Sequence, residues 1–264
     1  MDQQTNAKVE TKLESGIAQI TFQGERSNSM SSVALRTLAQ TIHDISKNPA
    51  TKVIILQSAG DRAFCAGASF DELVSISTAA AGKKFFSGFA EVILAMQAAP
   101  QLIIARVQGK AVGGGVGLIA AADYVFATTE SSVRLSELAL GIGPFVIGPV
   151  VENKVGRANY AALAIDADWR SAEWCLAHGL YQNLASSVPE LDLNVINFAA
   201  KLAEFSAPAM QELKTVIWEN LTLNRADSLS DLLEKRAEIS GRLVLSEESQ
   251  AAIAQAKLAL TKSR

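Results

Sequence analysis

The chain has 264 residues, of which 49% are hydrophobic and 19% are charged. This length predicts one large domain or one core with an appendage, and the composition predicts a large buried core and excludes a disordered chain. Its 24 basic and 27 acidic residues give a net charge of −3 without a dense basic run, which argues against nucleic-acid binding. The longest uncharged segments, residues 111–122 and 138–151, are shorter than the ~20 residues that cross a bilayer, so we expect no membrane association.

The first predicted elements are a hairpin and a helix. Residues 9–13 and 17–22 are short runs rich in β-branched residues, and the Gly-containing segment between them predicts a turn. A helix is predicted over residues 31–47, where apolar residues recur every three or four positions. Either Ser29 or Ser31 is expected to cap its N-terminus.

Strands and helices continue to alternate in the next part of the chain. Such alternation predicts crossover connections and a layered α/β core with a parallel sheet. The expected elements are a strand at residues 52–57, a helix at 80–99 that ends before Pro100, a strand at 102–107, a short helix at 116–122 and a strand at 124–127.

After the segment Ser-Ser-Val-Pro that ends at Pro189, the pattern becomes helical up to the C-terminus. We therefore expect an α/β core over residues 1–188 and a helical C-terminal region over residues 189–264. Because this region is rich in Leu and Ala, it needs a partner surface, either the core or a neighbouring subunit.

The compartment is predicted from the cysteines and the N-terminus. Cys65 and Cys175 form no framework of disulfides, and the two histidines do not complete a zinc site with them at any familiar spacing. The polar N-terminal residues contain no apolar segment of a signal peptide. We expect a cytoplasmic protein.

The first candidate site segment, AFCAGAS at residues 63–69, follows a predicted strand. Its residues Ala66, Gly67 and Ala68 have small side chains, which allow a ligand to approach the backbone closely. Small residues in such turns also occur for packing reasons alone, so the segment by itself is weak evidence.

The second candidate segment, VGGGVG at residues 112–117, lies between a predicted strand and a predicted helix. Consecutive glycines such as Gly113 and Gly114 leave the first N–H groups of the helix free to bind negative charge. Together with residues 63–69, these amides are of the kind that forms an oxyanion hole, in which donors converge on one carbonyl oxygen.

Glu137 precedes the uncharged residues 138–151 and therefore borders a buried apolar region. Burial raises the pKa of a carboxyl group toward the range that is useful for proton transfer. Most glutamates are solvated surface residues, so Glu137 alone does not identify a site.

Two other motifs in the sequence are weaker evidence for a functional site. Gly115-Val-Gly-Leu-Ile-Ala120 matches the dinucleotide fingerprint G-x-G-x-x-G/A, but the loop before Gly115 is too long for its tight turn. A dinucleotide-binding oxidoreductase is therefore a minor alternative. Gly67-Ala-Ser69 lacks the closing glycine of the nucleophile elbow G-x-S-x-G.

In order and spacing, the segments FCAGAS, AVGGGVG and LSELALGIGP resemble the enoyl-CoA hydratase/isomerase (crotonase) family, and residues 155–158 and 171–180 look like helices that follow in that family. The resemblance implies an α/β spiral core of repeated ββα units with a helical C-terminal region that supports trimers or dimers of trimers. It also implies an acyl-CoA thioester as the substrate, so that coenzyme A is part of the substrate and no separate cofactor or metal is needed.

The resemblance assigns a role to each candidate residue. The amides of Ala68 and Gly114 would form the oxyanion hole that stabilises a thioester enolate. Glu137 would be the acid/base. Ala66, Gly67 and Gly113 would contact the substrate beside these groups, and Phe145, where hydratases of the family carry a glycine, would shape the acyl pocket.

One departure from the family pattern bears on the reaction. Hydratases of the family carry a first glutamate where this chain has Gly117, and two carboxylates normally hold and activate the added water. A single carboxylate can still move a proton between two carbons, so Δ3–Δ2 double-bond isomerisation is slightly preferred over hydration of a 2-enoyl-CoA. Asp71 or Glu72 could supply a substitute acid. Decarboxylation of a branched acyl thioester on coenzyme A or a carrier protein, or acyl-CoA binding without catalysis, are alternatives.

Overall fold

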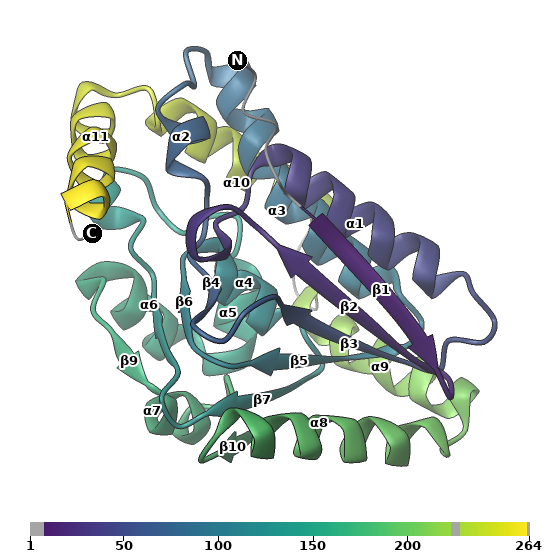
Figure 1. Cartoon of the computed structure of the whole chain (residues 1–264). Coiled ribbons are helices and arrows are strands. Elements are labelled where there is room, and N and C mark those ends of the chain that lie inside the picture. Colours follow the sequence, from purple (N-terminus) through teal and green to yellow (C-terminus); the bar gives the residue numbers. More distant parts are fainter. Residues whose placement is uncertain (1–7, 223–227, 263–264) are drawn as a thin grey trace.

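The computed structural model describes residues 8–222 and 228–262. Its larger sheet has six strands in the order β1-β2-β3-β5-β7-β10, in which β1 is antiparallel to β2 and all other neighbours are parallel (Figure 1). The predicted hairpin and the predicted parallel strands are thus confirmed. The strands are β1 (Lys8–Glu14), β2 (Ile17–Gln23), β3 (Val53–Ser58), β5 (Leu102–Val107), β7 (Tyr124–Thr128) and β10 (Asn183–Ala185).

A second sheet has four short strands in the order β4-β6-β8-β9, namely β4 (Ala63–Cys65), β6 (Lys110–Val112), β8 (Ser132–Arg134) and β9 (Arg170–Ser171). The chain passes from β3 to β4, from β5 to β6 and from β7 to β8, so each turn contributes one strand to each sheet. This is the spiral of ββα units that the family resemblance implies. The four short strands were missed in the sequence, because two or three residues are too few to show a strand periodicity.

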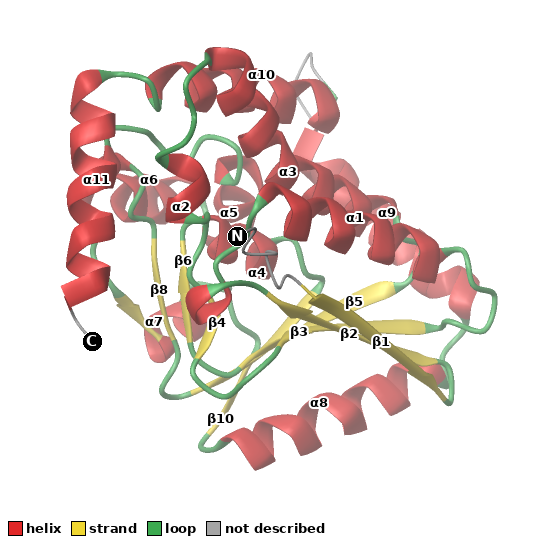
Figure 2. Ribbon diagram, turned by 45° about the horizontal axis from the view of Figure 1, so that its top comes forward, coloured by secondary structure: helices red, strands yellow, loops and turns green. Residues whose placement is uncertain are grey.

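Helices cover both faces of the larger sheet. Helices α1 (Ser32–Ser46) and α3 (Ala79–Ala98) lie on one face, and α8 (Val188–Ala203) lies on the other (Figure 2). Ser31 rather than Ser29 caps α1, since its hydroxyl oxygen accepts a hydrogen bond from the amide of Ala34 at 3.3 Å. Alternate side chains of β3 enter the two cores, with Ile54 and Leu56 on the side of α1 and Val53 and Ile55 on the side of α8.

The remaining helices follow the sheets or lie at the C-terminus. They are η1 (Arg26–Asn28), α2 (Phe70–Leu73), α4 (Gly114–Ala120), η2 (Leu138–Leu140), α5 (Gly148–Val155), α6 (Arg157–Asp166), α7 (Ala172–Ala177), α9 (Ala207–Thr222), α10 (Leu229–Leu243) and α11 (Glu247–Lys262).

The C-terminal part is helical over the residues that the structure describes, while residues 223–227 and 263–264 of the predicted helical region lie outside them. Pro189 lies in the first turn of α8, which packs on the larger sheet. Helix α10 packs against α3, and α11 packs against α2 and η2. The division into a core of residues 1–188 and an oligomerisation region of residues 189–264 stays a prediction.

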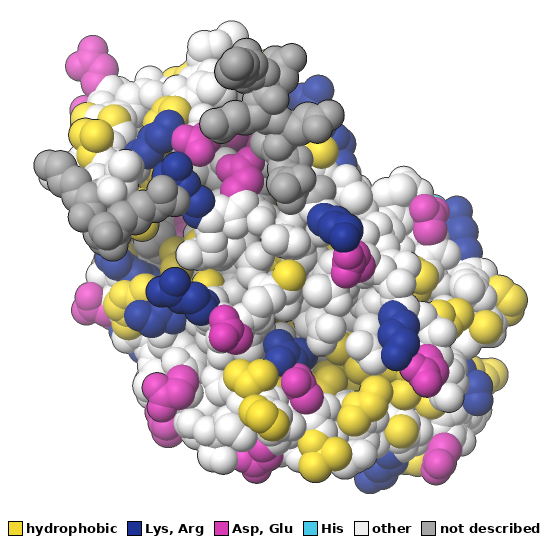
Figure 3. All heavy atoms as spheres, in the orientation of Figure 1, with side chains coloured by type: hydrophobic (Ala, Val, Ile, Leu, Met, Phe, Trp, Pro, Cys, Tyr) yellow, Lys and Arg dark blue, Asp and Glu magenta, His cyan; other side chains and the backbone are white. Residues whose placement is uncertain are grey.

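The surface in Figure 3 carries acidic and basic side chains interspersed over the face that Figure 1 shows. Hydrophobic side chains gather over α8, where Leu193 and Ile196 are exposed. Within residues 8–222 and 228–262, no helix combines the length and apolar character that a membrane span requires.

Candidate active site

The first candidate segment leaves β4 at Cys65 and turns at Gly67, whose φ of +86° is a conformation that favours glycine. The amide of Met30 donates to the carbonyl of Gly67 at 2.8 Å, and the amide of Ser69 donates to the carbonyl of Met30 at 2.9 Å. Met30 and Ala68 thus form a parallel bridge, in which the amide of Ala68 points to the side of the backbone away from Met30. The local pairing therefore directs the Ala68 N–H away from Met30.

The second candidate segment leaves β6 at Val112 and enters α4 through Gly113, which has a φ of +54°. The amide of Val116 is the first in the helix to bond the carbonyl of Gly113, at 2.8 Å. The amide of Gly114, in the first turn, has no partner within the helix and is available for a ligand. A Cβ on Gly114 would clash with the ring of Phe89, so a side chain cannot fit there.

The structure brings these two segments together, although they are far apart in the sequence. Strands β4 and β6 are parallel neighbours, with Cys65 opposite Ala111. A Cβ on Gly67 would lie 2.8 Å from the carbonyl oxygen of Val112 and 3.8 Å from the amide nitrogen of Gly114. The two turns therefore end at the same edge of the smaller sheet, with their backbones in close contact.

Glu137 reaches this edge from a third segment. It follows β8 and caps η2, and its carbonyl oxygen accepts the amides of Leu140 at 3.0 Å and Ile142 at 3.1 Å. A Cβ on Gly113 would lie 2.9 Å from its Oε1, and its Oε2 is buried without a hydrogen-bond partner. Burial raises the pKa of the Glu137 carboxyl from its ordinary value of 4.5 to about 7. Glu137 is thus able to gain and lose a proton at neutral pH.

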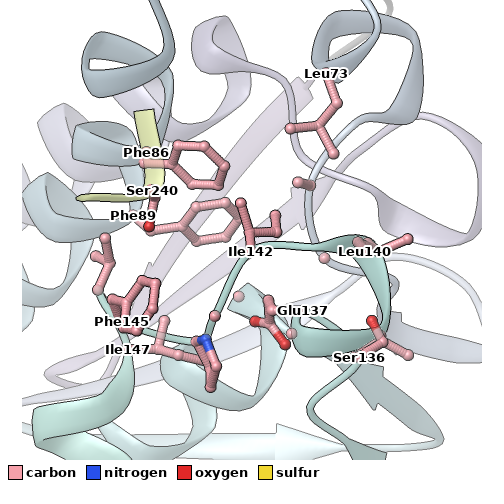
Figure 4. Close-up of a pocket in the computed structure, with 18 of the residues that line it drawn as sticks. Leu73, Phe86, Phe89, Ser136, Glu137, Leu140, Ile142, Phe145, Ile147 and Ser240 are labelled. Carbon is pink, nitrogen blue, oxygen red and sulfur yellow. The ribbon is translucent and has the colours of Figure 1, made fainter. Parts of the chain in front are cut away.

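All the predicted site residues lie around one pocket, whose lining is mostly apolar. Figure 4 shows Glu137 in this pocket, with Phe145 and Ile147 on one side and the rings of Phe86 and Phe89 above it. The lining includes Ala66, Gly67, Ala68, Gly113, Gly114, Glu137 and Phe145, which the sequence indicated, and Phe70, Leu73, Phe86, Phe89, Ser136, Leu140, Ile142, Ile147 and Ser240, which it did not.

The missed lining residues carry no motif of their own. Phe86 and Phe89 lie on α3 and Ser240 lies on α10, where apolar spacing resembles that of ordinary core helices. The one hint in the sequence was Gly114. Its missing side chain leaves room for the ring of Phe89, which lies directly against it.

The two acids considered as substitutes lie outside the pocket lining. Asp71 pairs with Lys257 of α11 at 2.6 Å, and its side chain is 59% exposed. Glu72 accepts hydrogen bonds from the amide of Ser32, at 2.6 Å, and from the Ser32 hydroxyl, so it binds the N-terminus of α1. Both carboxylates have structural partners and do not line the pocket.

Gly117 is enclosed in α4, and a Cβ there would lie 2.7 Å from the Cβ of Ile147. The Ile147 side chain therefore occupies the space into which a residue at position 117 would point.

No group of three or more His, Cys, Asp or Glu residues in the described part of the chain is arranged to hold a metal ion.

Comparison with known proteins agrees with this geometry. The family model "Enoyl-CoA hydratase/isomerase" matches residues 12–255. The chain is 27% identical over 204 residues to "Probable enoyl-CoA hydratase echA12" of Mycobacterium leprae, covering 74% of this chain and 69% of that protein. It is 27% identical over 229 residues to the peroxisomal "Delta(3,5)-Delta(2,4)-dienoyl-CoA isomerase" of Arabidopsis thaliana, covering 81% and 80%. A solved structure, "enoyl-CoA hydratase from Bacillus halodurans", has the same fold with a TM-score of 0.84 and 22% identity, covering 94% of this chain and 99% of that one. The chain belongs to the enoyl-CoA hydratase/isomerase family and is an enzyme of that family.

Proposed function

We propose that this enzyme isomerises the double bond of a 3-enoyl-CoA to give the 2-enoyl-CoA. The thioester oxygen would accept hydrogen bonds from the amides of Ala68 and Gly114. Glu137 would remove a proton from C2, and the electron pair would pass into the conjugated dienolate, whose negative charge rests on the thioester oxygen. Glu137 would then return the proton to C4, so that the double bond moves to C2–C3 and no atoms are gained or lost.

The carboxylate of Glu137 carries this proposal. Among the pocket-lining residues in the described chain it is the one acid. It lies beside the Gly113–Gly114 turn, shares the pocket with the Ala68 turn, and has a pKa raised to about 7. A base with such a pKa can both take and return a proton near neutral pH.

Position 117 favours isomerisation over hydration. Addition of water in the hydratases of this family uses a second carboxylate at that position, and here the volume is filled by Ile147. An apolar side chain in that space cannot hold or activate a water molecule, whereas transfer of a proton between two carbons needs one base.

The test is to incubate the purified enzyme with 3-hexenoyl-CoA in heavy water and to follow 2-hexenoyl-CoA and its deuterium content. Glu137→Gln is expected to lower the rate by a factor on the order of 10²–10⁴, because the amide cannot accept the proton. Asp71→Asn is the matched control, since that exposed carboxylate lies outside the pocket lining, and it should retain the wild-type rate.

Three outcomes would contradict the proposal in different ways. Full activity of Glu137→Gln would remove the proposed base. Rapid conversion of 2-hexenoyl-CoA to the 3-hydroxy product would assign hydration instead. Release of carbon dioxide from a branched carboxyacyl-CoA, with no isomerisation, would assign decarboxylation.

A further inference from the structure

Two helices, α3 and α10, make a very close backbone contact next to residues that line the pocket. A Cβ on Gly82 of α3 would lie 2.7 Å from the Cα of Gly241 of α10, and a Cβ on Gly241 would lie 2.8 Å from the carbonyl oxygen of Ala79. The two backbones thus touch without side chains between them. An acyl chain cannot pass between α3 and α10 at this crossing.

The pocket begins immediately beside this crossing. On α3, Gly82, Phe86 and Phe89 are spaced by four and three residues and therefore share one face of the helix. Both rings line the pocket and are nearly buried, with Phe86 8% and Phe89 4% exposed. The glycine lets α10 approach, and the two phenylalanines next to it form the aromatic wall.

The residue that α10 contributes to the pocket is Ser240, which directly precedes Gly241. Figure 4 shows Ser240 beside Phe86 and Phe89. Its side chain is 1% exposed, and its hydroxyl donates to the carbonyl oxygen of Arg236 on its own helix at 3.3 Å. The hydroxyl is thus bonded within α10, and the side chain acts in the pocket mainly through its small size.

We propose that the crossing of α3 and α10 closes the acyl end of the pocket, and that Ser240 and Phe86 set the length of acyl chain that fits, so that the enzyme takes thioesters with short, apolar acyl chains. This inference rests on the proposed function, since it requires the acyl group to lie in this pocket. It concerns which acyl chains fit and leaves the proton transfer by Glu137 unchanged.

The experiment measures the binding of unreactive saturated thioesters, butyryl-, hexanoyl- and decanoyl-CoA, by isothermal titration calorimetry. For the wild type, the affinity should rise from butyryl- to hexanoyl-CoA by about fourfold for each methylene group that is buried. It should fall again for decanoyl-CoA, whose chain would have to displace the closed end of the pocket.

Two variants change the end of the pocket in opposite directions. Ser240→Leu fills the end of the pocket and should weaken hexanoyl-CoA binding by about tenfold or more, with a smaller effect on butyryl-CoA. Phe86→Ala empties it and should move the preference toward decanoyl-CoA. Ser230→Leu, an exposed position on the same helix, is the matched control and should leave all three affinities unchanged.

The inference is overturned if the wild type binds decanoyl-CoA more tightly than hexanoyl-CoA and if Phe86→Ala does not change this preference. Should Ser240→Leu fail to fold, as judged by circular dichroism, Phe86→Ala decides alone, because it removes atoms and needs no new space. A failure of the wild type to bind any of the three thioesters would instead overturn the proposed function, so the two failures are distinguishable.

Discussion

At the level of single residues, the proton affinity of the Glu137 carboxylate depends on what surrounds it. Its carboxyl group lies among apolar side chains, one of its oxygens is buried without a partner, and no cation compensates its charge among the described residues that line the pocket. Burial is therefore the main cause of its raised pKa of about 7. The same burial that raises this pKa makes ionisation of Glu137 costly for the folded protein.

This cost predicts how activity and stability depend on pH. In the proposed reaction Glu137 must be ionised to remove a proton, so kcat/KM should rise with pH and reach half of its maximum near the Glu137 pKa of about 7. Between the ordinary pKa of 4.5 and about 7, the folded state binds more protons than the unfolded state, so the free energy of unfolding should fall as pH rises, by roughly 3 kcal/mol in total.

Urea unfolding at several pH values, for the wild type and Glu137→Gln, checks the second part of this prediction. The variant cannot ionise at this position, so its unfolding free energy relative to that of the wild type should increase from pH 5 to pH 8. A difference in unfolding free energy that stays constant over this range would show that the Glu137 pKa is not raised in the folded enzyme.

At the scale of secondary-structure elements, α2 has two neighbouring acids with different structural partners. Glu72 accepts two hydrogen bonds at the N-terminus of α1, where free amides and the helix dipole favour a negative charge. Asp71 forms an exposed ion pair with Lys257 of α11. The first contact joins elements that hold the Ala68 turn, and the second lies on the surface.

The two acids should therefore differ when each is replaced by alanine. Glu72→Ala should lower the free energy of unfolding by about 1.5–3 kcal/mol, because it removes charge-assisted hydrogen bonds that are partly buried. Asp71→Ala should lower it by at most about 1 kcal/mol, as is usual for an exposed ion pair. Equal losses in chemical denaturation would contradict the distinction between a helix-binding and a surface carboxylate.

At the scale of the whole molecule, a buried ion pair attaches α9 to the core. The ammonium group of Lys214 lies 3.2 Å from Oδ2 of Asp123 and donates to the carbonyl oxygens of Met96 and Gln101, each at 2.8 Å. Trp218, one turn further along α9, donates to Oδ1 of Asp123 at 3.2 Å. Burial lowers the pKa of Lys214, but the ion pair and the two carbonyl groups favour its charged form.

Lys214→Met should destabilise the protein by about 3–5 kcal/mol, because it removes the ion-pair partner of the buried Asp123 and the donor to two carbonyl groups. Lys201→Met, at an exposed position of α8, is the control and should change the stability by less than about 0.5 kcal/mol. Thermal unfolding followed by circular dichroism compares the two, and equal melting temperatures would show that the buried pair does not hold α9.

The trimeric assembly and the cytoplasmic compartment stay predictions.

The elements with a long hydrophobic pattern could be recognised from the amino-acid sequence alone. The hairpin β1–β2, the buried strands β3, β5 and β7 and the helices α1 and α3 were predicted within a few residues, because each buries several residues at a fixed period. The glycine-rich turns and Glu137 were also predicted, since glycines that a ligand or a second backbone must approach leave a mark in the sequence, and the family resemblance placed them in order.

Which of these residues meet, and what encloses them, depends on contacts between elements that are distant in the sequence. The adjacency of the Ala68 and Gly114 turns depends on the pairing of β4 with β6, strands too short to recognise from their own residues. The pocket wall formed by Phe86 and Ser240 joins residues that are distant in sequence, through the close crossing of α3 and α10. Such contacts follow from packing between distant elements, which no local pattern of side chains specifies.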